Sequence, residues 1–144
     1  MTPLPLIVHA AQPRPLRVLV ADDYTDAADS LATLMEMAGC EVRVAYDGEV
    51  AERVAAEFEP DVCLVDLRMP GQDGWDVARQ LRASRGPDEI LLVAVSGLHD
   101  REAVECSREA GFDCHLIKPV GFDKLHARLA EFAGRERELA TVAG

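Results

Sequence analysis

Positive charge, aromatic side chains and long apolar runs are all scarce in this sequence of 144 residues. It contains 15 lysines and arginines against 26 aspartates and glutamates, which gives a formal net charge of −11. This negative balance disfavours binding to nucleic acid or to an anionic membrane surface. No apolar run is long enough to cross a bilayer, and the start of the chain lacks the positive region of a signal peptide. We therefore expect a cytoplasmic chain that binds other proteins.

The four cysteines are too far apart for the paired motifs that bind zinc or exchange disulfides. The closest two in sequence, Cys106 and Cys114, are eight positions apart, whereas such motifs separate their cysteines by roughly two to four residues. We expect Cys106, Cys114, Cys40 and Cys63 to be buried, reduced thiols. The hydrophobic fraction of 49% is that of a folded globular protein, and the length suits a single domain.

Short apolar segments alternate five times with segments of helical periodicity. The apolar segments are 17–21, 41–45, 62–66, 90–95 and 114–117. Segments 62–66 and 90–95 are almost continuously apolar, which is typical of parallel strands covered on both faces. Segment 41–45 alternates with charged residues, which predicts a strand at the edge. Five strand–helix units predict an α/β fold with an open parallel sheet and helices on both of its faces.

The helical segments have apolar positions at helical spacing and recognisable ends. In the first segment, five residues predict one buried stripe: Ala27, Leu31, Leu34, Met35 and Ala38. We expect this helix to end at Gly39, and the next three to end at Pro60, at Gly86–Pro87 and at Gly111. The elements predict one domain over residues 16–133, after a flexible proline-rich extension at 1–15. A short polar tail follows at 134–144, either as a free tail or as an extension of the fifth helix.

Polar side chains follow four of the predicted strands at their carboxyl ends, where open α/β sheets bind ligands. They are Asp22 and Asp23 after the first strand, Asp66 at the third, Ser96 at the fourth and Lys118 at the fifth. Three carboxylates placed together repel one another unless a cation lies between them. Mg²⁺ prefers oxygen ligands, and an ammonium group suits phosphate. These residues predict a Mg²⁺ site for a phosphoryl group, with a carboxylate as the nucleophile.

The segment that follows Asp66 has the composition of a tight loop. Residues 69–74 include a proline and two glycines, which are typical of turns. We expect Asp73 in this loop to be solvated. We interpret Trp75, the only tryptophan, as a packing residue at the start of the third helix and not as a ligand contact.

Four segments carry the residues of the predicted site: VLVADD at 18–23, LVDLRMPGQDGW at 64–75, VAVSG at 93–97 and HLIKP at 115–119. Together they resemble the receiver domain of two-component response regulators. The resemblance covers about 118 of the 144 residues. It implies the flavodoxin-like receiver fold, a doubly wound five-stranded parallel sheet with strand order 2-1-3-4-5.

The resemblance also implies roles for the acidic residues. Asp66 would be the phosphoacceptor, taking a phosphoryl group from a sensor histidine kinase or a His phosphotransfer protein. Asp23, Asp66 and the backbone carbonyl of Arg68 would bind Mg²⁺, and Asp22 would act beside them, partly through water. The chain would then be a signalling phosphoacceptor, with no enzymatic activity beyond its own phosphorylation and dephosphorylation.

Lys118 and Ser96 would complete the site that the resemblance implies. Lys118 would pair with the phosphoryl oxygens, and Ser96 would move to hydrogen-bond them, which is the switch of the family. Receivers usually have Tyr or Phe three residues before this lysine. Here the position is His115, which either takes part in the switch or faces solvent. Arg68 and Leu98 lie where the family controls the access of water, and we predict slow self-dephosphorylation.

Several arrangements of such a receiver are compatible with the sequence. The few residues after the last helix predict a stand-alone receiver that signals through protein contacts. In the family, the fourth helix, fifth strand and fifth helix form the partner surface, which also serves homodimers. The proline-rich first residues also fit a linker, and hence a receiver domain excised from a hybrid histidine kinase. A receiver that has lost phosphorylation and only binds partners is a further alternative.

Two alternatives with a different site lack a residue that they require. A Mg²⁺-dependent phosphatase of the haloacid dehalogenase type also uses an aspartate nucleophile, but it needs a second aspartate where Arg68 stands. A dinucleotide-binding domain needs Gly-x-Gly-x-x-Gly after the first strand, and this sequence has none there.

Overall fold

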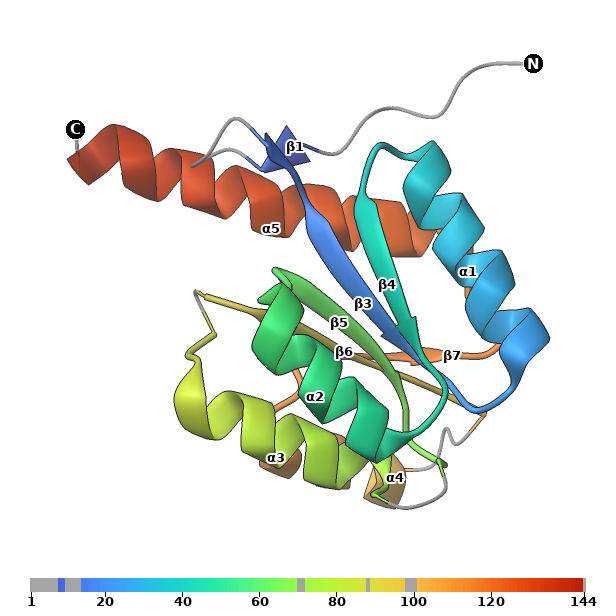
Figure 1. Cartoon of the computed structure of the whole chain (residues 1–144). Helices are drawn as coiled ribbons and strands as arrows, with labels where there is room; N and C mark the ends of the chain where they lie inside the picture. Colours follow the sequence, from blue (N-terminus) through green and yellow to red (C-terminus); the bar gives the residue numbers. More distant parts are fainter. Residues whose placement is uncertain (1–7, 10–13, 70–71, 88, 98–100, 144) are drawn as a thin grey trace.

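A layer of parallel strands lies between two layers of helices (Figure 1). The computed structural model describes residues 8–9, 14–69, 72–87, 89–97 and 101–143. Its parallel strands are β3 (Arg17–Ala21), β4 (Glu41–Ala45), β5 (Val62–Asp66), β6 (Leu91–Ser96) and β7 (Cys114–Ile117). They pair in the order β4-β3-β5-β6-β7. Counted in chain order, these strands follow 2-1-3-4-5, which confirms the predicted fold and the edge position of segment 41–45.

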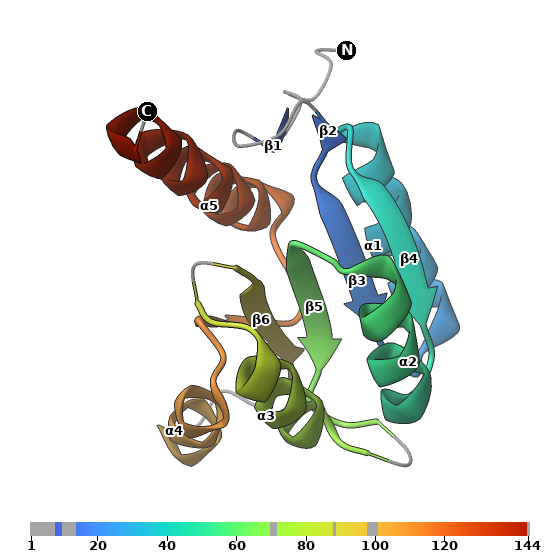
Figure 2. The ribbon, with the colours of Figure 1, turned by 60° about the vertical axis from the view of Figure 1, so that its left-hand side comes forward.

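The helices divide between the two faces of the sheet (Figure 2). Helices α1 (Thr25–Met37) and α5 (Phe122–Ala143) cover one face, and α2 (Gly48–Phe58), α3 (Gly74–Ser84) and α4 (Arg101–Ala110) cover the other. Successive strand residues point to opposite faces, so Val18 and Val20 belong to the first apolar core and Leu19 to the second. Every residue of β5 and β6 is buried, as predicted for central strands. None of the described helices is both long and apolar enough to span a membrane.

The predicted buried stripe of α1 is wrong in part. The helix buries Ala28, Ala32 and Met35, whereas Leu34 is 36% exposed and Ala27 is only half-buried. The prediction followed the larger apolar side chains. Alanine at the contact positions lets the helix backbone lie closer to the sheet, so close packing selects the small residues and turns the leucine outward.

The helix ends agree with the sequence. Gly39 follows α1 with a φ of 91°, and Gly111 follows α4 with a φ of 107°. This left-handed region favours glycine at the first position beyond a helix. Helix α2 ends before Pro60, and Glu59 between them also has a positive φ, 53°. Helix α3 ends at Ser84, two residues before Gly86–Pro87.

The two ends of the chain carry more regular structure than the composition predicts. Strand β1 (Val8–His9) pairs antiparallel with β2 (Arg14–Pro15) within the segment expected to be flexible, and β1 lies beside α5. The Arg14 guanidinium donates to both carboxylate oxygens of Asp61, at 2.9 and 3.0 Å, and Asp61 is 4% exposed. At the other end, α5 continues to Ala143, so the residues of the predicted polar tail extend the fifth helix, which was one of the two forms that we expected for them.

The cysteines are free thiols, but only two are fully buried. Burial raises the pKa of Cys40 to about 11 and that of Cys63 to about 12, so both stay protonated and unreactive at neutral pH. Cys106 on α4 and Cys114 on β7 are half-buried. The expectation of four buried thiols is therefore wrong for these two, because β7 is an edge strand and α4 packs on the outer part of the sheet.

Replacing Gly74 with alanine tests how closely α3 packs against β5. A Cβ atom at Gly74 would meet the Asp66 carbonyl oxygen and lie 2.8 Å from the Leu67 Cα, both of them backbone atoms. We expect Gly74→Ala to lower the free energy of unfolding by about 1–3 kcal/mol in urea denaturation. Gly86→Ala is the control, since nothing lies within 4 Å of its Cβ. Equal stability of the two variants would contradict the close packing.

Candidate functional site

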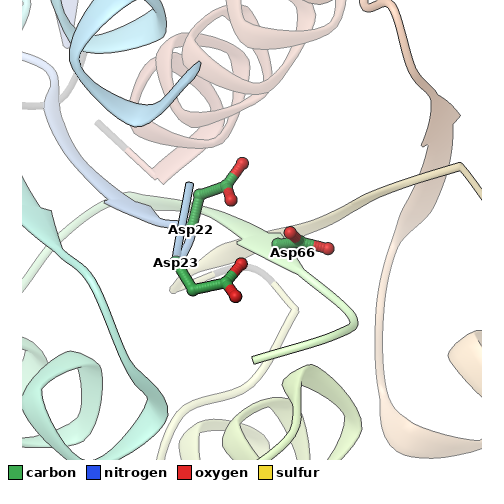
Figure 3. Close-up of side chains that lie close together, drawn as sticks. All are labelled: Asp22, Asp23 and Asp66. Carbon is green, nitrogen blue, oxygen red and sulfur yellow. The ribbon is translucent and has the colours of Figure 1, made fainter. Parts of the chain in front are cut away.

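The structure brings three acidic residues together at the carboxyl end of the sheet. Asp22 and Asp23 directly follow β3, and Asp66 is the last residue of β5, its neighbour in the sheet. One carboxylate oxygen from each lies within 4.8 Å of the others, and Figure 3 shows the three side chains around a common space. Asp22 and Asp66 are buried and Asp23 is exposed. The cluster is therefore open to solvent on the side of Asp23.

Neither aspartate after β3 is the residue that begins α1. The residue before that helix is Tyr24, whose side chain makes no capping hydrogen bond. Asp22 Oδ1 accepts the backbone N–H of Tyr24 at 3.0 Å, which leaves Oδ2 directed elsewhere. Helix capping, the ordinary structural role of aspartate at such a position, therefore does not explain the pair.

Lys118 supplies the positive charge of the cluster. Its Nζ lies 3.1 Å from Asp22 Oδ2 and 3.1 Å from Asp66 Oδ2. The lysine directly follows the edge strand β7, its backbone N–H donates to the Ser96 carbonyl at 2.9 Å, and its peptide bond to Pro119 is cis. One ammonium group thus joins the ends of β3 and β5 from the far side of β6.

The electrostatics of the site follow from burial and from like charge. Burial raises the pKa of Asp66, and the neighbouring Asp22 carboxylate raises it further. The Arg68 backbone N–H, 3.1 Å from Asp66 Oδ1, and the Lys118 ammonium act in the opposite direction without cancelling the effect. Burial alone would lower the pKa of Lys118, but the hydrogen bonds and charges of Asp22 and Asp66 outweigh burial and raise it. Lys118 is therefore charged at neutral pH, and the cluster keeps an excess of negative charge.

The donor set fits a hard divalent cation. Three carboxylates offer only oxygen ligands, and one of them is exposed, so a bound ion could keep several water molecules. The single ammonium group does not balance three carboxylates, and a divalent ion would offset both the burial and the Asp22 charge that raise the pKa of Asp66. The acidic cluster is thus compatible with Mg²⁺.

The remaining predicted residues lie around this cluster. Ser96 ends β6 and is 2% exposed, one position beyond Val95, which pairs with Asp66. The side chain of Arg68 is exposed, and its backbone N–H contacts Asp66. Leu98 and the loop residues 70–71 lie outside the described residues.

His115 does not face solvent, which was one of its two predicted environments. It lies opposite Ala94 in the sheet, it is half-buried, and its Nδ1 is 3.1 Å from Ser107 Oγ on α4. The prediction of a solvent-facing His115 is therefore wrong, because its side chain packs between β7 and α4.

Asp73 and Trp75, at the start of α3, both make contacts that we did not predict. Asp73 is half-buried and caps α3 by accepting the Asp76 N–H at 2.9 Å, so the prediction of a merely solvated side chain is wrong. Trp75 packs against the core as predicted, and its Nε1 also donates to Ser107 Oγ at 3.2 Å. We did not predict a role for Ser107. The available signal was a serine at helical spacing between Ala103 and Ala110 on the buried face of α4.

The fold and the acidic cluster define a class of protein: a doubly wound α/β domain with an acidic site, suited to a metal ion, at the carboxyl end of its strands. A comparison with family models narrows the class. The model of the response regulator receiver domain matches residues 18–130, and the chain belongs to this family. It is thus a receiver domain of two-component signalling, a family of signalling phosphoacceptors and not of classical enzymes.

Known proteins of different length share this domain. The chain is 37% identical over 141 residues to the sensory/regulatory protein RpfC of Xanthomonas campestris pv. campestris, covering 96% of this chain and 19% of RpfC. It is 39% identical over 126 residues to the transcriptional regulatory protein PrrA of Mycobacterium tuberculosis, covering 87% of this chain and 53% of PrrA. The chain therefore spans only about a fifth and about half of these relatives.

Solved structures agree on the fold. A CheY-like response regulator receiver domain protein from Methanospirillum hungatei superimposes with a TM-score of 0.79 at 24% identity, over 86% of this chain and 98% of the other. At this identity the likeness concerns the fold alone.

Replacing Asp66 with asparagine tests the charge repulsion in the cluster. Because the native pKa of Asp66 is raised, its ionisation destabilises the native state above the unfolded pKa of about 3.9. Without Mg²⁺ at pH 7, we expect Asp66→Asn to unfold at a higher temperature, by a few degrees, since about 1 kcal/mol corresponds to roughly 2–4 °C in a chain near this size. The difference should shrink as the pH falls through the native pKa and vanish below about 3.9.

Mg²⁺ should act in the opposite direction, stabilising the parent more than Asp66→Asn, because the ion binds the ionised cluster. The control is Asp26→Asn, an exposed aspartate in the first turn of α1, whose loss should lower stability by about 0.3–1 kcal/mol instead of raising it. Melting curves of the parent, Asp66→Asn and Asp26→Asn are recorded by calorimetry with and without Mg²⁺. A parent that is as stable as Asp66→Asn without metal would contradict the repulsion.

Proposed function

We propose that this receiver accepts a phosphoryl group on Asp66 from a phosphohistidine, in a Mg²⁺-dependent reaction, and passes on its state through protein contacts. The observation that carries the proposal is the meeting of Asp66, Asp22, Asp23 and Lys118 at one end of the sheet. The proposed ligands of Mg²⁺ are Asp23, Asp66 and the Arg68 carbonyl, with Asp22 acting partly through water. A bound ion would neutralise part of the negative charge of the attacking carboxylate and of the phosphoryl oxygens.

The protein residues position the reaction. An Asp66 carboxylate oxygen attacks phosphorus, the new P–O bond forms as the P–N bond to histidine breaks, and the electron pair leaves with the imidazole nitrogen. The Arg68 N–H holds one Asp66 oxygen at 3.1 Å, which fixes the direction of the carboxylate. Lys118 already contacts Asp66 Oδ2 and is proposed to pair with the phosphoryl oxygens. Ser96, at the end of the adjacent strand, is proposed to hydrogen-bond them as the switch.

The proposed partners follow from this chemistry and from the charge of the chain. The donor would be a sensor histidine kinase or a His phosphotransfer protein, which agrees with a cytoplasmic location. The output would leave through α4, β7 and α5, toward a downstream protein or a second copy of this chain. The match to one fifth of RpfC supports an alternative in which the same domain is one part of a hybrid kinase. The net charge of −11 argues against nucleic acid and membrane as direct ligands.

Intact mass measurement after incubation with Mg²⁺ and acetyl phosphate tests the phosphoacceptor. We expect the parent to gain the mass of one phosphoryl group, and to gain nothing in excess EDTA. Asp66→Asn should gain nothing in either condition, since it lacks the nucleophile. Asp73→Asn is the matched control, because this aspartate of the same loop caps α3 and is expected to leave the mass gain intact. An equal gain in Asp66→Asn, or none in the parent, would refute the proposal.

Arg68 is proposed to slow the loss of the phosphoryl group. Arg68 lies two residues after Asp66, the last residue of β5, and its side chain is exposed. From there its guanidinium group can pair with the phosphoryl oxygens and keep water away. We expect Arg68→Ala to shorten the half-life of the phosphorylated protein by a factor of about five, which corresponds to roughly 1 kcal/mol of barrier. Arg53→Ala, on the exposed face of α2, is the control. A half-life that stays equal or lengthens in Arg68→Ala would contradict this role.

A further inference from the structure

Ser107 is a buried polar residue that joins three elements of the fold. It lies on α4 between Ala103 and Ala110 and is 1% exposed. The Trp75 indole N–H of α3 donates to its Oγ at 3.2 Å, and Nδ1 of His115 on β7 lies 3.1 Å from the same atom. A hydroxyl both donates and accepts, so it can serve the indole and either tautomer of the imidazole at once. Helix α4 is thereby attached to both of its neighbours, α3 and β7. Figure 2 shows it beside α3.

One of these contacts leads back to Asp66 through α3. Trp75 directly follows Gly74, whose N–H donates to the Leu67 carbonyl at 3.0 Å. Gly74 lies so close to the backbone of Asp66 and Leu67 that even a Cβ atom would not fit there. A displacement at the end of β5 is therefore passed on to the start of α3, because close-packed backbone cannot absorb it.

The other contact leads back to Asp66 through β7. His115 and Lys118 are three residues apart, on and just after this short strand. Lys118 Nζ in turn contacts Asp66 Oδ2 at 3.1 Å. The contacts, together with the backbone from Gly74 to Trp75 and from His115 to Lys118, therefore form a closed ring that starts and ends at Asp66 and passes through Ser107.

We propose that Ser107 is the positioning residue that couples α4 to the state of Asp66. This inference rests on the proposed function, because phosphorylation is the event that acts on the ring. A phosphoryl group on Asp66 changes its charge and gives Lys118 new oxygen partners. Both paths from Asp66 meet at Ser107, so α4 follows a change that reaches it along either path. The exposed side of α4 is charged, with an ion pair between Glu105 and Arg108, and this is the surface that would be repositioned for a partner.

The single tryptophan makes the ring directly observable. In a ¹⁵N-labelled sample, its indole N–H gives one NMR signal that is sensitive to the hydrogen bond with Ser107. We expect this signal and the backbone amide signals of α4 to move when the parent is phosphorylated with Mg²⁺ and acetyl phosphate. In Ser107→Ala, we expect the same gain in mass, an indole signal already displaced before phosphorylation, and loss of the response of the α4 amides.

Variants that remove only one of the two contacts with Ser107 distinguish coupling through the ring from a general destabilisation of the fold. Trp75→Phe and His115→Phe each keep an aromatic ring and remove one contact with Ser107, so each should reduce the α4 response without abolishing it. They also provide the test if Ser107→Ala does not fold. Ser84→Ala is the matched control, because Ser84 bonds only the Leu81 carbonyl within α3 in the described structure and should respond like the parent.

Two results would overturn the inference while leaving the proposed function intact. One is a phosphorylated Ser107→Ala whose α4 amide signals shift as they do in the parent. If Ser107→Ala does not fold, the equivalent result is an unchanged α4 response in both Trp75→Phe and His115→Phe. The other is a parent that gains the phosphoryl mass while its indole signal stays in place. Absence of any mass gain in the parent would instead refute the proposed function, and with it the event that this coupling requires.

Discussion

The Lys118 ammonium group, held between the carboxylates of Asp22 and Asp66, is the interaction on which the site depends. Two unit charges about 4 Å apart interact by roughly 4 kcal/mol near a protein surface, so clustered carboxylates strongly oppose one another. Lysine relieves part of this repulsion, and the pKa of Asp66 is still raised, by burial first and by the neighbouring Asp22 carboxylate second. The folded chain thus holds an excess of negative charge, which is compatible with a bound divalent cation.

The parallel topology holds these charged groups together against their repulsion. The cluster needs β3 beside β5, and β7 on the far side of β6, with all their carboxyl ends at one edge. The backbone hydrogen bonds of the sheet and the two apolar cores on its faces hold the strands in this order. The same rigidity lets a local event matter at a distance, since the close contact of Gly74 with β5 and the bonds of Ser107 leave α3, α4 and β7 little freedom to move separately.

Sequence patterns were sufficient for most of the fold and for the residues at the strand ends. Central strands read as continuous apolar runs, helix ends as glycine or proline, and the site as polar residues after strands. The failures have a common cause. Leu34 was expected inside and Cys114 buried, but hydrophobicity alone does not reveal how closely a helix approaches a sheet or how well an edge strand is covered. Asp73 was expected to be solvated, although it caps α3. Capping could not be predicted because the sequence did not fix the first residue of that helix.

The sequence by itself determined the alternation of strands and helices, the strand order through family resemblance, and the identity of the charged groups at the edge of the sheet. These follow from local periodicity and from chemistry that each segment carries alone. Only the tertiary structure decided that Arg14 reaches Asp61, that His115 turns toward α4, and that Ser107 receives both an indole and an imidazole. Such contacts join residues far apart in the chain, and their geometry is set by the packing of whole elements, which no local pattern encodes.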